Sequence, residues 1–183
     1  SGFVGKNLLS KINLYENSVT IISRKNFVSK AKLIIADLII DTDKLKKLFI
    51  EYDIIFNCSG ELNNEDKMNE LHVKSLSKII DFLSKFCLKN HRKIRWIQVS
   101  SIGVYGFDKK KALIDENSEK NPSNYYEKTK LSSEKIIING ANAYFEYIIL
   151  RPSTIYGRGM KSDFIQKISQ YLKKKIFFYI NSK

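Results

Sequence analysis

The 183-residue chain has only two cysteines, two prolines and one tryptophan. It also lacks any apolar run approaching the roughly 20 residues that a membrane-spanning helix needs. Cys58 and Cys87 lie within apolar segments, so two buried thiols in a reducing compartment are expected rather than a disulfide. The sequence shows no Cys/His cluster with metal-site spacing and no secretory signal. These features favour a cytoplasmic protein that has no metal centre.

Acidic residues are also few, because 32 Lys and Arg stand against 19 Asp and Glu, for a formal net charge of +13. Such an excess can indicate nucleic-acid binding. Here the basic residues are mostly lysines scattered over predicted helices and loops, without a basic recognition helix or an aromatic RNA-binding signature. We therefore expect neither nucleic acid nor a membrane as partner. The 43% apolar and 28% charged residues are typical of a globular core.

Short apolar segments alternate with helical patterns along the chain. Strands are predicted at 19–23, 33–36, 53–58, 94–99 and 144–150, and helices at 6–13, 43–51, 66–88, 123–138 and 162–174. The segment 53–58 is apolar without alternation, which predicts a strand covered on both faces of its sheet. The polar stretch 106–121 is expected to be a loop. This alternation predicts an α/β fold with a doubly wound parallel sheet.

A tyrosine and a lysine four residues apart carry the clearest chemistry. Tyr126 and Lys130 share a face of the predicted helix 123–138. A tyrosine has an ordinary pKa of about 10, so it needs a neighbouring cation before it can act as a base near neutral pH. Three other pairs have this spacing: Tyr105–Lys109, Tyr171–Lys175 and Tyr179–Lys183. Only Tyr126 follows a strand that ends in serines, Ser100 and Ser101; two surface helix residues are the alternative interpretation.

Two glycines open the chain. Gly2-Phe3-Val4-Gly5 runs into the predicted helix 6–13. Glycines at such a place let the backbone approach a pyrophosphate and let the helix pack on a strand. The pair matches the last two glycines of Gly-x-x-Gly-x-x-Gly, and the first glycine and the strand before it are absent, so the chain is expected to begin inside the motif. An ordinary glycine turn is the alternative.

Together these motifs resemble the extended short-chain dehydrogenase/reductase family, in particular its NAD(P)-dependent sugar-nucleotide epimerases, dehydratases and reductases. The resemblance runs in register along nearly the whole chain. Beyond the motifs above, it rests on five segments: Val19-Thr20-Ile21-Ile22, Asp37-Leu38, Asp53-Ile54-Ile55-Phe56-Asn57-Cys58-Ser59-Gly60, the serine strand with its Val104-Tyr105-Gly106 tail, and Leu150-Arg151-Pro152-Ser153-Thr154-Ile155-Tyr156-Gly157.

The resemblance implies a Rossmann-type dinucleotide-binding domain over residues 1–160, without its first strand, and the start of a C-terminal substrate-binding region over 161–183. The fold is thus expected to be truncated at both ends. The implied cofactor-binding residues are Gly2, Phe3, Val4, Gly5, Ser23, Arg24, Asp37, Leu38, Cys58, Ser59, Gly60, Ser100, Tyr126, Lys130, Pro152 and Ser153.

The resemblance also implies roles for three catalytic residues. Tyr126 would act as general acid/base on a sugar hydroxyl or keto oxygen, and Ser101 would hydrogen-bond that oxygen. Lys130 would hold the nicotinamide ribose and lower the pKa of Tyr126. NAD-selective sites usually have an acidic residue after the second strand, whereas this chain has Ser23-Arg24-Lys25. NADP(H) is therefore favoured over NAD(H), with a solvated loop pair as the alternative.

The residues after Ser101 restrict which of the family's reactions this chain is expected to catalyse. Family dehydratases usually carry an Asp-Glu pair there, and this chain has Ile102-Gly103. We therefore predict an epimerase or reductase of a nucleotide-activated sugar, in surface-polysaccharide synthesis, with a homodimer possible for the full-length form. His72 stands where many relatives have asparagine. The alternatives are a non-catalytic NAD(P)-binding sensor or scaffold, which the retained trio argues against, and a reductase of non-sugar carbonyl substrates.

Overall fold

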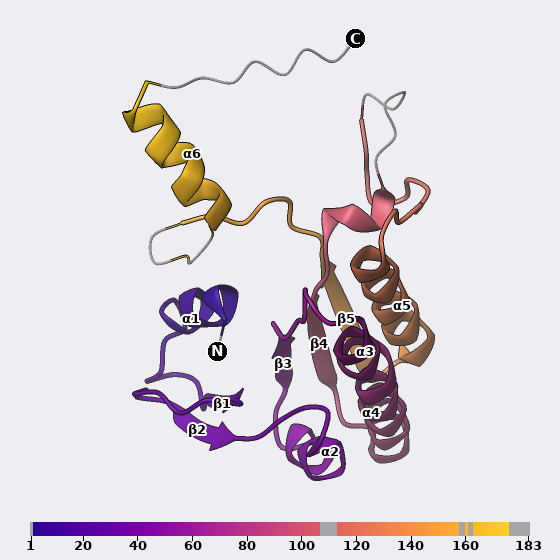
Figure 1. The fold of residues 1–183 in the computed structure, drawn as a ribbon. Coiled ribbons are helices and arrows are strands. Elements are labelled where there is room, and N and C mark those ends of the chain that lie inside the picture. Colours follow the sequence, from indigo (N-terminus) through magenta and orange to yellow (C-terminus); the bar gives the residue numbers. More distant parts are fainter. Residues whose placement is uncertain (1, 107–112, 158–159, 161–162, 176–183) are drawn as a thin grey trace. The chain divides into compact units, whose positions relative to one another are not determined.

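The computed structural model describes residues 2–106, 113–157, 160 and 163–175 (Figure 1). By their contacts they divide into two compact units, Ser1–Ser153 and Thr154–Lys183. The smaller unit contains one helix, α6 (Asp163–Lys173), among its described residues. The boundary predicted at residue 160 stays a prediction, and the apolar segment 177–180 lies outside the described residues.

Among its described residues the larger unit contains five strands, and all of their pairings are parallel. β1 (Thr20–Ser23) pairs with β2 (Lys32–Ile35), while β3 (Ile54–Asn57), β4 (Ile94–Val99) and β5 (Phe145–Leu150) form a second sheet in that order. Each strand overlaps one of the five predicted segments. The predicted parallel, Rossmann-type α/β architecture is thus confirmed.

Helices connect these strands. They are α1 (Phe3–Leu9), α2 (Thr42–Phe49), α3 (Glu65–Asn69), α4 (Leu76–Asn90) and α5 (Tyr125–Gly140). The single helix predicted over 66–88 is interrupted, because a π-helical segment, Glu70–Ser75, separates α3 from α4. A π-helical segment closes its hydrogen bonds from residue i to residue i+5, and its six residues here are too few to show an apolar period of their own. Apolar spacing alone therefore did not reveal it.

The main core lies on one face of the β3–β4–β5 sheet. Helix α4 packs against α2, α5 and β5, and Figure 1 shows α4 and α5 side by side along the sheet. Leu45, Leu83, Trp96 and Phe145 are almost wholly buried there. Phe49 meets Trp96 edge-on, with ring centroids 6.0 Å apart and an interplanar angle of 87°, a geometry that favours aromatic pairs.

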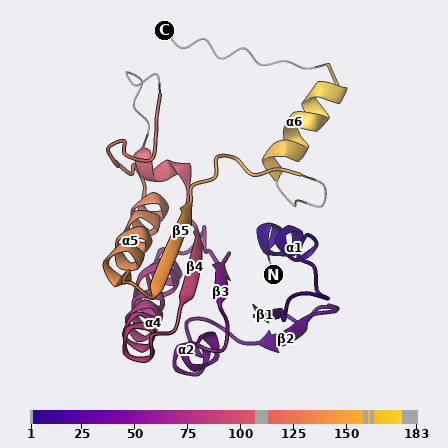
Figure 2. The ribbon, with the colours of Figure 1, turned by 180° about the vertical axis from the view of Figure 1, so that it is seen from behind.

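The other face of this sheet is less covered. In β3, Ile55 is 8% exposed, whereas Ile54 is 49% and Phe56 is 42% exposed. The prediction that this strand is covered on both faces is therefore wrong for the described residues. Successive side chains of a strand point to opposite faces, and the helices that pack here cover only the face of Ile55. The view from behind in Figure 2 shows the strands from their less covered side.

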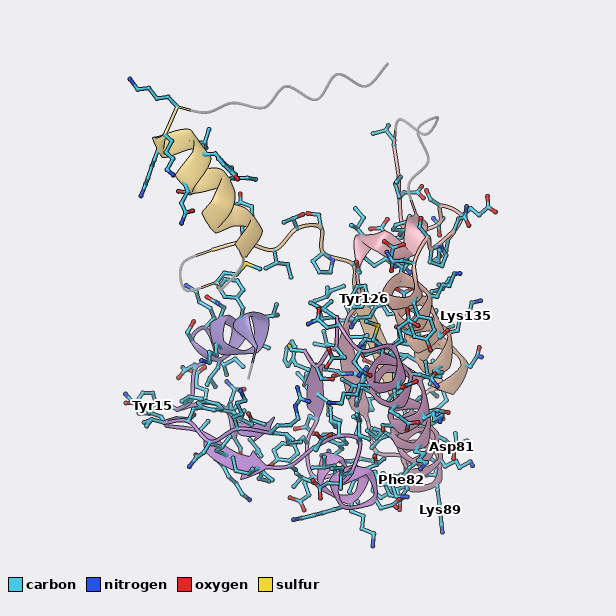
Figure 3. The ribbon with its side chains drawn as sticks, viewed as in Figure 1. Tyr15, Asp81, Phe82, Lys89, Tyr126 and Lys135 are labelled. Atoms are coloured by element: carbon cyan, nitrogen blue, oxygen red, sulfur yellow. The ribbon has the colours of Figure 1, made fainter. Side chains whose placement is uncertain are left out.

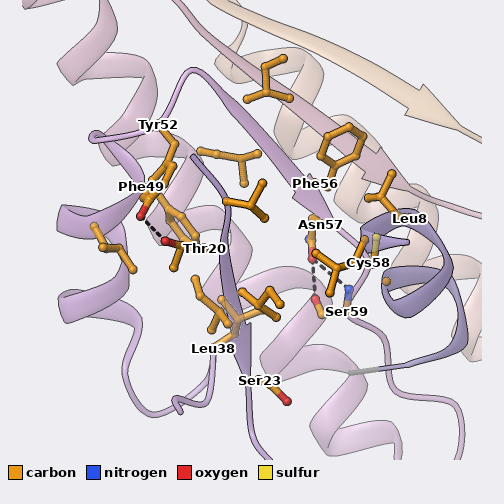
Figure 4. Close-up of a pocket in the computed structure, with 18 of the residues that line it drawn as sticks. Leu8, Thr20, Ser23, Leu38, Phe49, Tyr52, Phe56, Asn57, Cys58 and Ser59 are labelled. Atoms are coloured by element: carbon orange, nitrogen blue, oxygen red, sulfur yellow. Dashed lines mark hydrogen bonds between the residues drawn. The ribbon is translucent and has the colours of Figure 1, made fainter. Parts of the chain in front are cut away.

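A cavity lies between the two sheets. Among the described residues, β1 and β3 are not paired with each other. Residues of both strands instead line a cavity of about 1110 Å³ (Figure 4). The Tyr52 hydroxyl, just before β3, donates to the hydroxyl of Thr20 in β1 and links the two sides. The cavity extends to the carboxyl ends of both strands, where parallel α/β folds bind their ligands.

Candidate active site

Helix α5 begins where a capping box places Tyr126 in its first turn. Asn124 Oδ1 accepts the Glu127 N–H at 2.9 Å, and Glu127 Oε2 accepts the Asn124 N–H at 3.3 Å and the Ser123 N–H at 2.7 Å. Such a box satisfies amides that the first turn would otherwise leave unpaired. Tyr126 consequently lies at the end of α5 next to the carboxyl end of the sheet (Figure 3).

The face of α5 that is turned to the protein is largely polar. Its buried residues are Thr129, Lys130, Ser133, Glu134 and Ile137. Burying a polar group costs free energy unless it finds a partner, and in the described part of the chain none of the fully buried side-chain nitrogen or oxygen atoms lacks one. These partners fix how α5 sits on β4, β5 and the loop after β3.

Lys130 joins α5 to the end of β4. Its side chain is only 2% exposed, and Nζ donates to the Val99 carbonyl oxygen at 3.0 Å. Nζ lies 5.8 Å from the centroid of the Tyr126 ring. Burial lowers the pKa of Lys130 to about 8, with Cys58 and Glu134 acting in the opposite direction. The lysine therefore reaches the strand end directly before Ser100 and Ser101, as the predicted catalytic trio requires.

The pKa of Tyr126 differs from the sequence-based expectation. The side chain is partly buried, and this burial, together with the charge of Glu127, raises its pKa above the ordinary value. The expected lowering of this pKa is therefore wrong for this structure, because burial and the charge of Glu127 set the direction of the shift. At neutral pH Tyr126 is a protonated phenol, which suits it to donate a proton first.

The two serines at the end of β4 have different environments. Ser101 Oγ accepts the Gly103 N–H at 3.1 Å and so caps a 3₁₀ turn, Ile102–Tyr105. Its own hydroxyl proton is left for another partner. Ser100 is 3% exposed, and its hydroxyl donates to Glu134 Oε1 at 2.5 Å. The predicted cofactor contact of Ser100 would thus need an atom other than this hydroxyl proton.

A buried ion pair, which sequence reasoning missed, stands behind Ser100. Arg151 Nη2 lies 2.8 Å from Glu134 Oε2, and Arg151 Nε donates to Oε1 at 3.0 Å. Arg151 Nη1 also donates to the Tyr105 hydroxyl at 2.7 Å. The signal was available, because Glu134 follows Lys130 by one helical turn and therefore shares its face.

The cavity brings together most of the residues predicted on the adenosine and phosphate side of the cofactor. It is lined by Gly2, Gly5, Ser23, Arg24, Asp37, Leu38, Cys58, Ser59 and Gly60. Figure 4 labels Ser23, Leu38, Cys58 and Ser59 among them. Phe3, Val4, Ser100, Tyr126, Lys130, Pro152 and Ser153 do not line this cavity. Pro152 instead accepts the Ile102 N–H at 3.0 Å through its carbonyl oxygen, and Ser153 is exposed. The glycine turn and the catalytic trio thus do not line one common cavity.

The residues at one end of the cavity, near the glycine turn and the carboxyl ends of β1 and β3, fit a dinucleotide. Gly2 precedes α1 in an extended conformation, and a Cβ built on it would meet nothing within 4 Å. At the end of β1, Ser23 Oγ accepts the Lys25 N–H at 3.2 Å and donates to the Lys25 carbonyl oxygen at 2.9 Å. Arg24 beside it is exposed. An open turn and an exposed cation suit the phosphate groups of such a ligand.

Hydrogen bonds of the Asn57 side chain hold the loop after β3. Asn57 Oδ1 accepts from the Ser59 hydroxyl at 2.5 Å (Figure 4), and Asn57 Nδ2 donates to Gln98 Oε1 at 2.9 Å. Burial raises the pKa of the Cys58 thiol, while the charge of Lys130 opposes this. Cys58 is therefore a neutral thiol at the floor of the candidate site, and its side chain faces Gly5, where a built Cβ would lie 3.9 Å from that of Cys58.

His72 lies beside Tyr126, although the sequence assigned it no role. The two rings meet edge-on, with centroids 6.0 Å apart and an interplanar angle of 74°. Burial, together with the charge of Lys130, lowers the pKa of His72 to about 4, against the opposing charge of Glu61. The imidazole is thus neutral at physiological pH.

Two other kinds of site were searched for in the described residues. No group of three or more His, Cys, Asp or Glu side chains there could hold a metal ion. None of the helices formed by those residues has both the length and the apolar character needed to cross a membrane.

Comparison with solved structures finds the same fold in several enzymes. One is UDP-glucuronic acid 4-epimerase from Bacillus cereus in complex with NAD, with 22% identity and a TM-score of 0.72 over 94% of this chain and 60% of that one. A second is ADP-L-glycero-D-manno-heptose-6-epimerase from Helicobacter pylori, with 21% identity and a TM-score of 0.69 over 94% and 60%. A third is a short-chain dehydrogenase/reductase superfamily protein from Agrobacterium tumefaciens with bound NAD, with 18% identity and a TM-score of 0.70 over 82% and 46%.

The chain therefore spans about half to three-fifths of the length of these structures. Comparison with curated protein sequences finds no match. A model of one protein family does match, over residues 1–179, which is almost the whole chain. With its parallel strands, its glycine turn and its Tyr126–Lys130 helix, the chain belongs to the NAD-dependent epimerase/dehydratase family.

Proposed function

We propose that the full-length gene product transfers hydride at a ring carbon of a nucleotide-activated sugar, as an epimerase or a reductase that uses a nicotinamide dinucleotide. The observation that carries this proposal is the buried Lys130, whose Nζ contacts the end of β4 at Val99 and lies 5.8 Å from the centroid of the Tyr126 ring. Family membership supports it, as do the UDP-sugar and heptose epimerases of the same fold.

In this proposal three side chains handle the proton. Tyr126 gives a proton to a single sugar oxygen as the phenol, or takes one from that oxygen as the phenolate. Ser101 donates its free hydroxyl proton to that oxygen and so orients it. Lys130, as a cation, attracts the negative charge that Tyr126 carries as a phenolate and so opposes the rise in pKa that burial causes. A positioned acid/base of this kind contributes about 10²–10⁴ in rate.

The cofactor would lie along the strand ends. Residues Gly2–Gly5 would hold its pyrophosphate, Asp37 and Leu38 its adenine, and Lys130 its nicotinamide ribose. When bound, the nicotinamide supplies the hydride acceptor and donor. For Lys130 this means exchanging or sharing its bond to Val99, because an ammonium group has three protons to donate.

We further propose that NADP(H) is preferred over NAD(H). Arg24 is exposed at the end of β1, and the neighbouring loop is closed by the Ser23 hydroxyl. The exposed Arg24 guanidinium suits a 2′-phosphate, which it can bind by charge-assisted hydrogen bonds. NAD is the dinucleotide in the Bacillus cereus and Agrobacterium tumefaciens structures, so the preference is one that a direct titration must decide.

The experiment that tests the function is turnover by the full-length gene product. A panel of UDP-, ADP- and dTDP-sugars is incubated with NAD⁺ or NADP⁺ and followed by NMR for epimers, and keto-sugar nucleotides are incubated with NADPH and followed by absorbance. We expect turnover of at least one sugar nucleotide. Tight cofactor binding with no turnover of any sugar nucleotide would instead support a non-catalytic sensor or scaffold.

A further inference from the structure

His72 lies in the one part of its helix that departs from α-helical geometry. It belongs to the π-helical segment Glu70–Ser75 between α3 and α4, and only 4% of it is exposed. Such segments are rare and are frequent at functional sites. The segment turns the His72 ring into the space between the loop after β3 and helix α5, where two of its neighbours are Gly60 and Thr129.

The hydrogen bonds of the ring fix its tautomer. The Glu61 backbone N–H donates to His72 Nε2 at 3.1 Å. A backbone amide can only donate, so Nε2 must be the unprotonated nitrogen and the proton must be on Nδ1. Nδ1 lies 3.0 Å from Thr129 Oγ1 and therefore donates to it. The Thr129 hydroxyl in turn donates to the Tyr126 carbonyl oxygen at 2.8 Å.

These bonds form one directed chain from the loop after β3 to the first turn of α5. Every donor in it has an acceptor, and the Thr129 hydroxyl accepts one bond and donates the next. The backbone of His72 strengthens the same link, because its carbonyl oxygen accepts from the Ser133 hydroxyl of α5 at 2.8 Å. Both the ring and the backbone of His72 are thus attached to the helix that carries Tyr126 and Lys130.

The loop after β3, on the Nε2 side of the ring, lies close to His72 and Lys130. A Cβ built on Gly60 would lie 3.8 Å from Lys130 Nζ and 3.9 Å from His72 Nε2, so Gly60 faces both side chains. Glu61 Oε1 accepts the N–H groups of Leu62 and Asn63, each at 3.0 Å, and closes the turn that follows. The loop therefore takes its position from His72 and from its own turn.

We propose that His72 is a positioning residue, whose neutral imidazole sets the loop Gly60–Glu61 and the Tyr126 helix at a fixed separation. This rests on the proposed function, in which the loop lies under the cofactor and Tyr126 moves the proton. The two arms of the ring then have separate tasks. The arm from Nε2 to Glu61 holds the cofactor side, and the arm from Nδ1 to Thr129 holds the proton-transfer side.

Three substitutions of His72 and one of Thr129 distinguish the contributions of these two hydrogen bonds. In His72→Gln the side-chain amide reaches the position of Nε2 and can accept from Glu61. In His72→Asn the shorter side chain reaches only the position of Nδ1 and can donate to Thr129. His72→Phe fills a similar volume and makes neither bond. Thr129→Val removes the Thr129 arm from the other side and serves as the matched partner for His72→Gln.

The expected results differ between kinetic and binding measurements. A net hydrogen bond typically changes such a quantity by roughly threefold to tenfold. In the full-length gene product, His72→Asn should weaken cofactor binding by that factor and change kcat by less than twofold. His72→Gln and Thr129→Val should lower kcat by that factor and leave the cofactor Kd nearly unchanged. His72→Phe makes neither hydrogen bond, so it should both weaken cofactor binding and lower kcat. His72→Gln combined with Thr129→Val should lower kcat little more than either change alone.

A residue that only supported packing would give another pattern. All variants would lower the melting temperature, and His72→Phe would retain the wild-type kcat and cofactor Kd. That result would overturn the proposal, as would equal losses of both parameters in His72→Gln and His72→Asn. Should His72→Phe fail to fold, Thr129→Val and the NMR measurement on the unaltered protein decide the question.

A measurement without turnover tests the tautomer directly. The ¹⁵N shifts of His72 in the unaltered protein at pH 7 should show a protonated Nδ1 and an unprotonated Nε2. A protonated Nε2, or an imidazolium, would overturn the proposal. If no sugar nucleotide is turned over, the proposed function fails, but the tautomer and the effect of His72→Asn on cofactor Kd still decide the role of His72.

Discussion

Glu134 and Arg151 form a two-point ion pair, with Arg151 Nη2 2.8 Å from Glu134 Oε2 and Arg151 Nε 3.0 Å from Oε1. The Glu134 side chain is 1% exposed and that of Arg151 is 15% exposed. The pair joins α5 to the residue after β5, and through the Ser100 hydroxyl it also holds the end of β4. It thereby supports the strand end on which Ser101 stands.

Removal of the Glu134 charge should therefore be costly. Breaking a buried ion pair typically destabilises a protein by about 3–5 kcal/mol, because the remaining charge is left uncompensated. Here Arg151 keeps its bond to Tyr105, so we expect Glu134→Gln to fall near the lower end of that range in urea unfolding. Asp81→Asn is the matched control, since Asp81 and Lys85 pair at 2.8 Å on the exposed side of α4 and exposed pairs contribute about 0–1 kcal/mol. Similar losses for both variants would contradict a supporting role for the buried pair.

The stability of the fold should depend on pH through His72. Its pKa is lowered from 6.5 to about 4, first by burial and then by Lys130, while Glu61 acts in the opposite direction. Between these two values the unfolded chain binds more protons than the folded one, so stability falls as the pH is lowered from 6.5 to 4. The loss from this one group is up to about 3 kcal/mol.

Urea unfolding at several pH values measures this dependence. The wild-type profile should fall more steeply between pH 6.5 and 4 than that of His72→Phe, in which the titrating group is gone. His91→Asn is the control, because His91 is exposed and the αL conformation that it adopts (φ 52°) suits asparagine. Parallel profiles for the wild type and His72→Phe would contradict the assigned pKa.

Lys130 should lower the stability of the fold at neutral pH, and this cost should disappear in the alkaline range. Burial lowers its pKa from 10.5 to about 8, so between these values the folded protein has already lost a proton that the unfolded chain keeps. Stability should consequently rise with pH from about 8 to 10.5, by up to about 3 kcal/mol from this group. The rise should be absent from the pH profile of stability of Lys130→Met. In the proposed function the same titration removes the cation, so kcat should decline above about pH 8.

The cofactor preference can be tested at Arg24. Arg24→Ala should weaken NADPH binding by about 1.5–3 kcal/mol, the range for a hydrogen bond to a charged group, and should affect NADH much less. Lys30→Ala is a control, because Lys30 is exposed and does not line the cavity. Equal losses for both nucleotides in a fluorescence titration would remove the argument for 2′-phosphate recognition.

Much of the fold could be predicted from the sequence because its strands are short apolar segments with helical patterns between them. The five strands and the helix that begins at Tyr125 lie where those patterns indicated. Tyr126 and Lys130 were found because residues four apart share a helical face. The glycine turn and the residues after β1 and β3 were found because ligands of parallel sheets bind at the strand ends.

The remaining features depend on packing that no local pattern reports. Ile54 and Phe56 are exposed because helices cover only the other face of β3, whereas an apolar segment looks the same with either arrangement. The pKa of Tyr126 is raised by burial and by the charge of Glu127, an environment that the Tyr-x-x-x-Lys spacing cannot specify. His72 was noticed in the sequence only as a substitution, since its role comes from Glu61 and Thr129, which lie 11 and 57 residues away.

The most direct test of the whole account is Tyr126→Phe in the full-length gene product, with kcat and cofactor Kd measured on the same preparation. This change removes one hydroxyl and keeps the ring that packs against His72, so the fold and cofactor binding should be preserved. The account predicts a loss of about 10²–10⁴ in kcat, the contribution of a positioned acid/base, with a cofactor Kd within a few-fold of wild type. Wild-type kcat in Tyr126→Phe would contradict the assignment of Tyr126 as the proton-transfer residue.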